Sequence, residues 1–535
     1  MTFFKIAIIN VLFFIMITLF SPNQWHFLIL TVAQLVFVPI VLHIVTVNNR
    51  NWFTRFVPYI FIPPSLGIVF LQLIPTNMLL NGAFAGLYFV FTIIVAYYGF
   101  FRFMNRGFVN LEEFMIDMGL IYLAIGGAWF FASETNVNTG FSPILTWLTS
   151  IHFHYASFLL PVFVGFLGRL YKSTLYKWIC TLILIAPIIV AVGITYSVVL
   201  ELISVLIYIV AIYGLIILSY KAKFSNTIQK RMVRISFAAL GLSILFSLMY
   251  AFGNLTGLYS VTITFMLYFH GITNCLLFAL VGVIGWNIKP PCSNEREMDF
   301  PVSKIKGKMT VGEAVLSEKL DDPQRNGLVD DMEIYKTSID SETHSSSVVD
   351  FYENTRNYRL FAEVNWHNWF KPFAYVYKLL SRNVKQINLP LSSKKVEMIG
   401  DILSVKEGID GRTSPRAWVR KANGETVFIA VYSYHKTGNR TYMNIALPLP
   451  WSTMTGILEL NWNERKLELT SKRKQPGDSD SGVYFTLKNF LFKLPIEERF
   501  RVGEDVDGNL EAQHVMWIFS IPFLTINYTI CQKSR

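Results

Sequence analysis

The chain has 535 residues, of which 53% are hydrophobic and only 16% are charged, and its mean hydropathy is +0.42. Charged residues make up about 25% of soluble proteins, so this composition excludes an ordinary soluble enzyme and indicates a membrane protein. The net charge of +11 is uneven: residues 1–290 hold 14 Lys and Arg against 5 Asp and Glu, whereas residues 291–535 hold 33 against 31. The basic excess lies in short loops between apolar runs, which argues against nucleic acid as a partner.

Ten apolar runs fill the first part of the chain, and each is long enough for a helix that crosses about 30 Å of hydrocarbon. They cover residues 4–20, 26–46, 57–74, 82–103, 112–132, 143–168, 178–196, 199–219, 235–253 and 259–287. The first run lacks an A-x-A-like cleavage site, so it is interpreted as a span and not as a signal peptide. We therefore expect an α-helical polytopic membrane bundle over residues 1–289, with almost no loop at Tyr196–Val198.

Connections that carry Lys and Arg alternate along the chain with connections that carry neither. The basic connections hold Arg50 and Arg55, then Arg102 and Arg106, then Arg169, Lys172 and Lys177, then Lys221, Lys223, Lys230, Arg231 and Arg234. The positive-inside rule assigns such loops to the cytoplasm. This predicts that both termini and the whole second half of the chain are cytoplasmic.

Histidines near the middle of two spans are the most informative polar residues, because polar side chains are costly in lipid and usually face a bundle interior. His154 in the sixth span and His270 in the tenth each lie about 16 Å from the outer entry of the span, at 1.5 Å per residue. On an ideal helix His152 points about 200° away from His154, whereas His270 and Asn274 share one face. A kink or local unwinding at Pro161 could re-aim the turn that carries the first two.

Imidazoles at this depth suit a transition-metal or haem site, a proton relay, or recognition of a polar solute or lipid headgroup. The structural alternative is hydrogen bonding between helices, worth about 0.6 kcal/mol per bond. The sequence has no zinc-type H-x-x-x-H pair and no C-x-x-C-H motif, so it names no cofactor. The candidate ligand-binding or proton-relay residues are His152, His154, His270, Asn274 and Asp117 of the fifth span, and the three histidines are the candidate metal ligands.

Two stretches carry a resemblance to a known family. His152-Phe-His-Tyr-Ala-Ser-Phe-Leu-Leu-Pro161, with His270-Gly-Ile-Thr-Asn274, resembles the YndJ-like family of bacterial membrane proteins, typified in Firmicutes. In that family a Gly often stands at the position of Ser157, and Asn-Ala-Leu-Gly-Phe stands where this chain has Asn274-Cys-Leu-Leu-Phe278. The resemblance implies a multi-pass protein of the bacterial plasma membrane and no particular activity.

The second half changes character twice before it becomes regular. Residues 290–354 are polar, with Ser and acidic clusters, which is typical of a flexible tether. Residues 355–390 interleave aromatic and basic side chains, which fits a helix at the membrane interface. A helix packed on its own domain fits the same pattern, and Pro372 interrupts the periodicity.

Residues 391–535 alternate apolar and polar side chains between turn signals such as Asn423-Gly424. Such signals between alternating runs indicate β-hairpins, so we expect an antiparallel barrel or strongly curved sheet of about seven to nine strands. Arg412, Arg416 and Arg420 are interpreted as solvated positions on an edge. The sequence has no G-x-S-x-G, P-loop or dinucleotide-binding motif, which disfavours ATP-driven transport and dinucleotide chemistry.

These patterns favour a protein that binds or moves a small solute, lipid or proton at the intramembrane His/Asn site, coupled to a cytosolic β domain. The expected partners are membrane lipid and a small-molecule ligand. One alternative is a membrane-embedded metal- or haem-dependent enzyme, which is less favoured because Asp117 lies only about 8 Å from the inner face by helix rise. Another is a membrane scaffold for a ligand-binding β domain.

Overall fold

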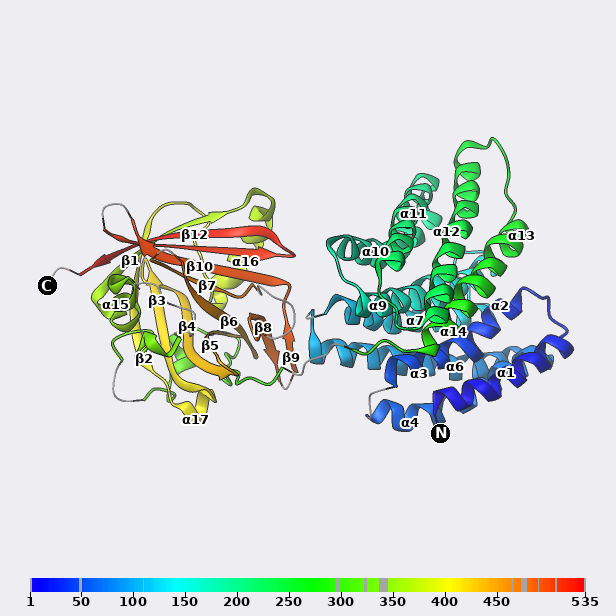
Figure 1. Cartoon of the computed structure of the whole chain (residues 1–535), viewed down its shortest axis with the longest axis horizontal. Coiled ribbons are helices and arrows are strands. Elements are labelled where there is room, and N and C mark those ends of the chain that lie inside the picture. The colour runs from blue at the N-terminus through cyan, green and yellow to red at the C-terminus, as the bar shows by residue number, and fades with distance from the viewer. Residues whose placement is uncertain are drawn as a thin grey trace. The chain divides into compact units, whose positions relative to one another are not determined.

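The structure is a computed structural model that describes residues 2–47, 51–108, 110–293, 298–321, 325–335, 345–463, 465–472, 479–488, 490–505 and 508–533. The chain forms two compact units. The first comprises residues 1–103 and 110–295, and the second comprises residues 104–109 and 296–535 (Figure 1).

The first unit holds ten helices that are long and apolar enough to cross a membrane, counted over the described residues. Each matches one of the ten runs expected from the sequence, so the fold class of this half is confirmed. They are α1 (Phe3–Phe20), α2 to α3 (Phe27–Thr46), α4 to α5 (Trp52–Leu73), α6 (Met78–Arg106), α7 (Leu111–Glu134), α8 to α9 (Pro143–Leu170), α10 (Thr174–Tyr196), α11 (Val198–Lys221), α12 (Thr227–Thr256) and α13 to α14 (Ile263–Ile288).

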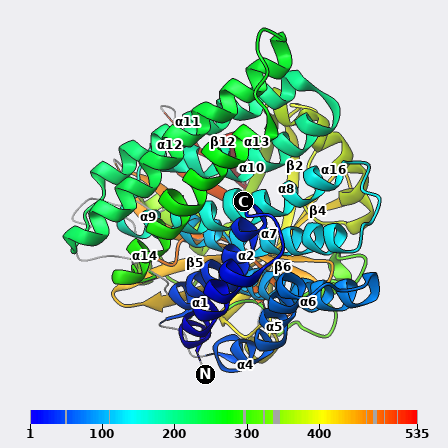
Figure 2. The ribbon, with the colours of Figure 1, turned by 90° about the vertical axis from the view of Figure 1, so that its right-hand side faces the viewer.

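Neighbours in sequence are often neighbours in space. The helices α10, α11 and α12 pack side by side in chain order (Figure 2). The boundary between α10 and α11 is at Ser197, whose side chain accepts a hydrogen bond from the amide of Leu200 at the start of α11. At the end of α12, Gly257 has a φ of 68°. That positive φ is accessible to glycine at little cost.

Wide π-helical turns interrupt the second, sixth and tenth of these helices. They are η1 (Ala33–Phe37), η2 (Tyr155–Leu159), η3 (Leu267–Gly271) and η4 (Thr273–Leu280). In the span formed by α8 and α9, the amide of Leu160 donates to the carbonyl of Tyr155, five residues earlier, just before Pro161. The unwinding expected near Pro161 therefore takes the form of a π turn, a distortion often found at functional sites.

The second unit is a closed antiparallel β-barrel, which confirms the expected fold class. Ten strands follow one another in the order β5-β4-β3-β2-β1-β12-β11-β10-β7-β6, and β6 pairs back to β5. The strands β8 and β9 extend from β6. The bounds are β1 (Tyr358–Trp366), β2 (Val396–Ser404), β3 (Thr413–Ala422), β4 (Glu425–Thr437), β5 (Arg440–Leu449), β6 (Ser452–Asn463), β7 (Lys466–Thr470), β8 (Gly482–Leu487), β9 (Phe490–Lys493), β10 (Ile496–Glu504), β11 (Leu510–Ile518) and β12 (Ile521–Gln532).

The described residues thus form twelve strands, more than the seven to nine expected from the sequence. One reason is the turn between β11 and β12, where Phe519 and Ser520 have positive φ values of 49° and 64°. Two-residue hairpins of this kind usually carry Asn or Gly, so an apolar Phe hides the turn within an apparently continuous run.

Parts of residues 290–354, expected to be a flexible tether, fold onto the barrel instead. Ile305, Val311 and Leu316 are buried in a cluster on the outer face of β3, β4 and β5. The short helices η6 (Met332–Tyr335) and α15 (Ser346–Glu353) bury side chains in the core inside the barrel. The Ser-rich, acidic composition of the segment conceals these widely spaced apolar residues.

Residues 355–390, expected to be helical, contain both a strand and a helix. Residues 358–366 form β1, which pairs with β12 and β2 in the barrel wall. The helix α16 spans Lys371–Val384, with Pro372 in its first turn, where a proline is tolerated. The proline therefore begins this helix instead of interrupting a longer one.

Candidate intramembrane site

His154 is fully buried and bonded through both ring nitrogens. It ends α8 (Pro143–His154), and its Nδ1 lies 2.8 Å from the carbonyl of Ser150. Its Nε2 lies 2.8 Å from the hydroxyl of Tyr88 on α6. A carbonyl can only accept, so Nδ1 carries the proton and Tyr88 donates to Nε2. With both nitrogens occupied inside the protein, this histidine joins the sixth span to the fourth.

His270 belongs to a second network, shared with α12. Its Nδ1 lies 3.0 Å from the carbonyl of Ser243, and the hydroxyls of Ser243 and Ser247 lie at 3.1 and 3.2 Å. Its Nε2 lies 3.0 Å from Nδ2 of Asn274, one turn further along. The Ser243 hydroxyl donates to Oδ1 of Asn274 at 2.6 Å, which closes the network. The shared face expected for His270 and Asn274 is therefore present.

The His270 network remains open to its surroundings. His270 and Asn274 are half-buried, whereas the Ser243 side chain is fully buried. Both residues lie on π-helical turns, His270 on η3 and Asn274 on η4. Polar groups that are ordered but still accessible can exchange a protein partner for a ligand, which a fully buried pair such as His154 and Tyr88 cannot do without unfolding.

His152 points away from His154, as its spacing predicts. Its Nδ1 lies 2.8 Å from the carbonyl of Leu148, and its side chain is exposed. It lies within electrostatic range of His270. The hydrogen bonds of His154, by contrast, lie with Tyr88 and Ser150.

Asp117 has its contacts in a different cluster, formed by charged side chains of α6, α7 and α9 (Leu160–Leu170) and by Lys172, which follows α9. Nε of Arg102 lies 2.7 Å from Asp117, and the Nη2 of Arg102 lies 2.8 Å from Glu113. Arg169 contacts the other oxygen of Glu113 at 2.6 Å, and Lys172 pairs with Glu112. The charges of these three acidic and three basic residues balance. Their ion pairs tie α6 and α9 to α7.

The candidate metal ligands belong to different hydrogen-bond networks. In the described part of the chain, no group of three or more His, Cys, Asp or Glu side chains is arranged to hold a metal ion. His152 lies within electrostatic range of His270, and the bonds of His154 and Asp117 lie with other residues.

Comparisons with known proteins decide the family. The sequence profile described as YndJ-like protein matches residues 28–278. The chain is 37% identical over 456 residues to the uncharacterized membrane protein YndJ of Bacillus subtilis (strain 168), and the match covers 84% of both chains. The chain belongs to the YndJ-like protein family. It is a membrane protein with multiple spans, and no solved structure matches it.

Several residues of these networks carry no distinctive sequence signal. Ser243 and Ser247 stand one turn apart on α12, and only this i, i+4 spacing of hydroxyls marks the face that meets His270. Tyr88 is one of 25 tyrosines. Long-range partners of this kind follow from packing, which a local pattern does not encode.

Proposed function

We propose that this YndJ-like protein binds a polar ligand inside the membrane through His152, His270 and Asn274. One observation carries the proposal: His270 and Asn274 lie on π-helical turns, are held in a hydrogen-bond network with Ser243 of α12, and are only half-buried. Intramembrane polar groups are costly, and those that face a bundle interior commonly mark ligand or proton pathways. The ligand is a small solute, a lipid headgroup or a proton.

The test compares His270→Ala and Asn274→Ala with Leu276→Ala, an exposed position on the same span. Two readouts apply: lipid retained by the purified full chain in native mass spectrometry, and dye-reported proton entry into liposomes under a membrane potential. We expect both site variants to lower at least one readout about tenfold, the equivalent of 1.4 kcal/mol, and Leu276→Ala to change neither. If neither site variant changes either readout, a lipid headgroup and a proton are both excluded as the ligand.

We further propose that the protein lies in the bacterial cell membrane with both termini and the β-barrel in the cytoplasm. The alternation of basic and uncharged loops supports this orientation. A fluorescent protein that folds only in the cytoplasm, fused after the last strand, should fluoresce, and a periplasm-dependent phosphatase in the same place should be inactive. The opposite pair of results would reverse the orientation.

Membrane lipid is the partner we propose for α16. This helix buries its small residues Ala374 and Ser381 and exposes its large apolar ones, with Phe373 61%, Val376 63% and Leu379 73% exposed. Packing on its own domain, the alternative considered from the sequence, does not cover this face. An exposed apolar stripe is typical of a helix that lies in the headgroup region.

Flanking groups suit an anionic leaflet. Lys371, Arg382 and Lys385 are exposed along or just beyond α16, and each such cation near an anionic surface contributes about 1 kcal/mol. Trp369, 43% exposed, lies just before this helix and donates through Nε1 to the carbonyl of Pro522, at the start of β12, at 2.8 Å. Aromatic residues of this kind favour the interface.

Spin labels test the docking of α16 in the full chain. A label at Leu379, introduced after removal of the four cysteines, should be relaxed by lipid-soluble oxygen more than by a water-soluble nickel complex. A label at Lys466, an exposed residue of the barrel, provides the matched control and should show the reverse. Equal accessibility to the aqueous reagent at both positions would refute the docking.

A further inference from the structure

The interior of the barrel contains one arginine that differs from its neighbours. On β3, Arg416, Trp418 and Arg420 alternate with outward-facing residues and line cavities inside the domain. The expectation that Arg412, Arg416 and Arg420 are solvated edge positions is wrong, because all three are at least nine-tenths buried. Alternation alone does not distinguish a polar residue that faces solvent from one that faces a barrel interior.

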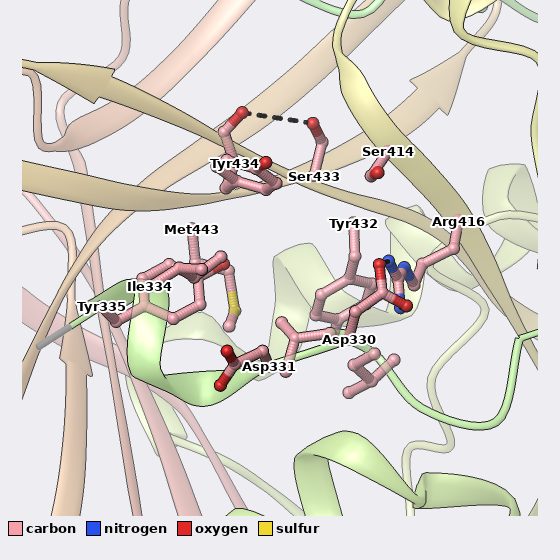
Figure 3. A pocket seen from close by; sticks show the side chains of 12 residues that line it. Asp330, Asp331, Ile334, Tyr335, Ser414, Arg416, Tyr432, Ser433, Tyr434 and Met443 are labelled. Carbon is pink, nitrogen blue, oxygen red and sulfur yellow. Dashed lines mark hydrogen bonds and ion pairs between the residues drawn. The ribbon is translucent and has the colours of Figure 1, made fainter.

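Two of these arginines have a carboxylate partner. Arg412 lies 2.7 Å from Asp410, with both side chains fully buried. Arg416 lies 2.6 Å from Asp330, and Figure 3 shows this pair beside Tyr432. A buried guanidinium with a matched carboxylate keeps its charge at low cost.

Arg420 has no such partner. It is 8% exposed, and among the described residues no carboxylate lies within 4.0 Å of it in an ion pair. Its Cζ lies 4.4 Å from the ring centres of both Trp418 and Phe428, and it lies within electrostatic range of Tyr528. Its Nε is buried without a hydrogen-bond partner. The aromatic rings offset part of the cost of this buried cation, but they leave a donor unused.

Other charged groups of the interior are already engaged. Glu498 lies against Gly456 of β6, and its carboxylate is 3.2 Å from Nε2 of His514. Arginine stays charged under all physiological conditions, so it cannot escape its burial by losing a proton. A bound anion would supply the missing partner.

The space beside Arg420 defines the chemistry of that anion. The cavity has a volume of about 50 Å³ and is lined mainly by apolar side chains, among them Leu360, Ile445, Leu469, Val502 and Ile530. A second cavity of about 70 Å³ shares Leu328, Tyr432 and Met443 with it and carries the polar pair Asp330 and Arg416 (Figure 3). One cation in apolar surroundings suits a single negative charge attached to an apolar group.

We propose that the barrel interior binds a monocarboxylic acid. Its carboxylate pairs with the guanidinium of Arg420, which lies against the rings of Trp418 and Phe428. Its apolar tail lies among the aliphatic residues of the barrel wall. A water needs about 10–15 Å³ of such space, so the cavity admits a carboxylate and a few carbons. A longer acid requires the segment around Leu328 to move. The ligand is therefore either a short free acid or a longer acid with an acyl chain. This site is separate from the intramembrane histidines.

Calorimetric titration of the full chain in lipid nanodiscs tests the proposal, with empty nanodiscs as the blank. The probes are butanoate, octanoate and the uncharged octan-1-ol. Saturable butanoate binding identifies a short free acid as the ligand class, and binding of octanoate alone identifies an acyl acid; either supports the proposal. If neither acid binds saturably, the proposal is refuted.

Variants locate the binding at Arg420. We expect Arg420→Met to weaken binding of the acid at least tenfold, and Arg420→Lys, which keeps the charge, to lie between it and the parent protein. Binding of octan-1-ol should be equal in all three. The control Arg501→Met changes an exposed arginine that pairs with Glu468 and should have no effect. Equal acid affinity in the parent and both Arg420 variants, with normal gel-filtration profiles, would overturn the assignment. If Arg420→Met fails to fold, Arg420→Lys decides.

Discussion

The Nε2 atom of His154 lies 2.8 Å from the hydroxyl of Tyr88, so an imidazole of the sixth span is bonded to the fourth. The ring also packs closely against α7, where a Cβ added at Gly126 would come within 2.9 Å of its Nδ1. Every polar atom of this histidine is therefore satisfied by protein. These bonds tie the helices together, and the half-buried His270 is the residue that we propose as a ligand contact.

Removal of the Tyr88 hydroxyl should lower the stability of the protein. In Tyr88→Phe the Nε2 of His154 becomes a buried acceptor without a donor, which costs about 1–3 kcal/mol. Thermal unfolding of the full chain in detergent measures the loss. Tyr97→Phe, at a position 59% exposed on the same helix, should stay within about 0.5 kcal/mol of the parent protein. Equal stability of the two variants would contradict the bond.

The hydrogen-bond partners fix the tautomers of the intramembrane histidines. Nδ1 of His152, His154 and His270 each faces a backbone carbonyl, of Leu148, Ser150 and Ser243 respectively. A carbonyl accepts only, so all three rings should carry the proton on Nδ1. Nitrogen chemical shifts of ¹⁵N-labelled histidine in lipid should show this form for the three residues. An Nε2-protonated His270 would mean that the Asn274 amide is turned around.

Local periodicity accounts for what the sequence could and could not predict. Long apolar runs have one stable solution in lipid, so all ten spans were predictable. The divergence of His152 from His154 follows from 3.6 residues per turn. The partners Tyr88, Ser243 and Arg102 were not predictable, because they come from other helices and their residue types are common.

In the barrel, alternation predicts strands but does not predict which face of a strand is buried. Alternation on β3 gives the right strand but does not say which face is inside, so the buried Arg420 looks like a solvated residue. Burial of an arginine contradicts the usual preference of that residue and depends on the rings of Trp418 and Phe428, which β3 and β4 bring together. Exceptions of this kind are most frequent at functional sites.

Disruption of the charge cluster around Arg102 should be strongly destabilising. Arg102→Leu leaves Asp117 buried without this partner, and removal of one member of a buried ion pair typically costs about 3–5 kcal/mol. Adding Asp117→Leu should recover part of the loss, because a buried pair replaced by apolar residues is often nearly neutral. Unfolding in detergent measures both variants. A double variant no more stable than the single one would show that Asp117 depends on other contacts.

The ion pair of Asp330 and Arg416 should make the stability of the barrel depend measurably on pH in the acidic range. Burial alone would raise the pKa of Asp330, but its hydrogen bond with Arg416 and the charges of Arg416 and Arg325 lower that pKa below its ordinary value of 3.8. A carboxyl group whose pKa is lower in the folded state adds stability above its unfolded pKa. That contribution is lost as the pH falls through the lower, folded value.

We therefore expect Asp330→Asn to be less stable than the parent protein at pH 6, with a gap that narrows as the pH falls below about 3.8. The gap should be less than about 1 kcal/mol, because the Asp330 side chain is 51% exposed and screened by solvent. Unfolding midpoints of the full chain from pH 6 to pH 3 provide the measurement. Glu511→Gln, which breaks an exposed pair with Lys466, serves as the control and should show a smaller effect at pH 6. A gap that widens on acidification would mean that the folded protein favours the protonated form of Asp330, and the assigned role of Arg416 would be wrong.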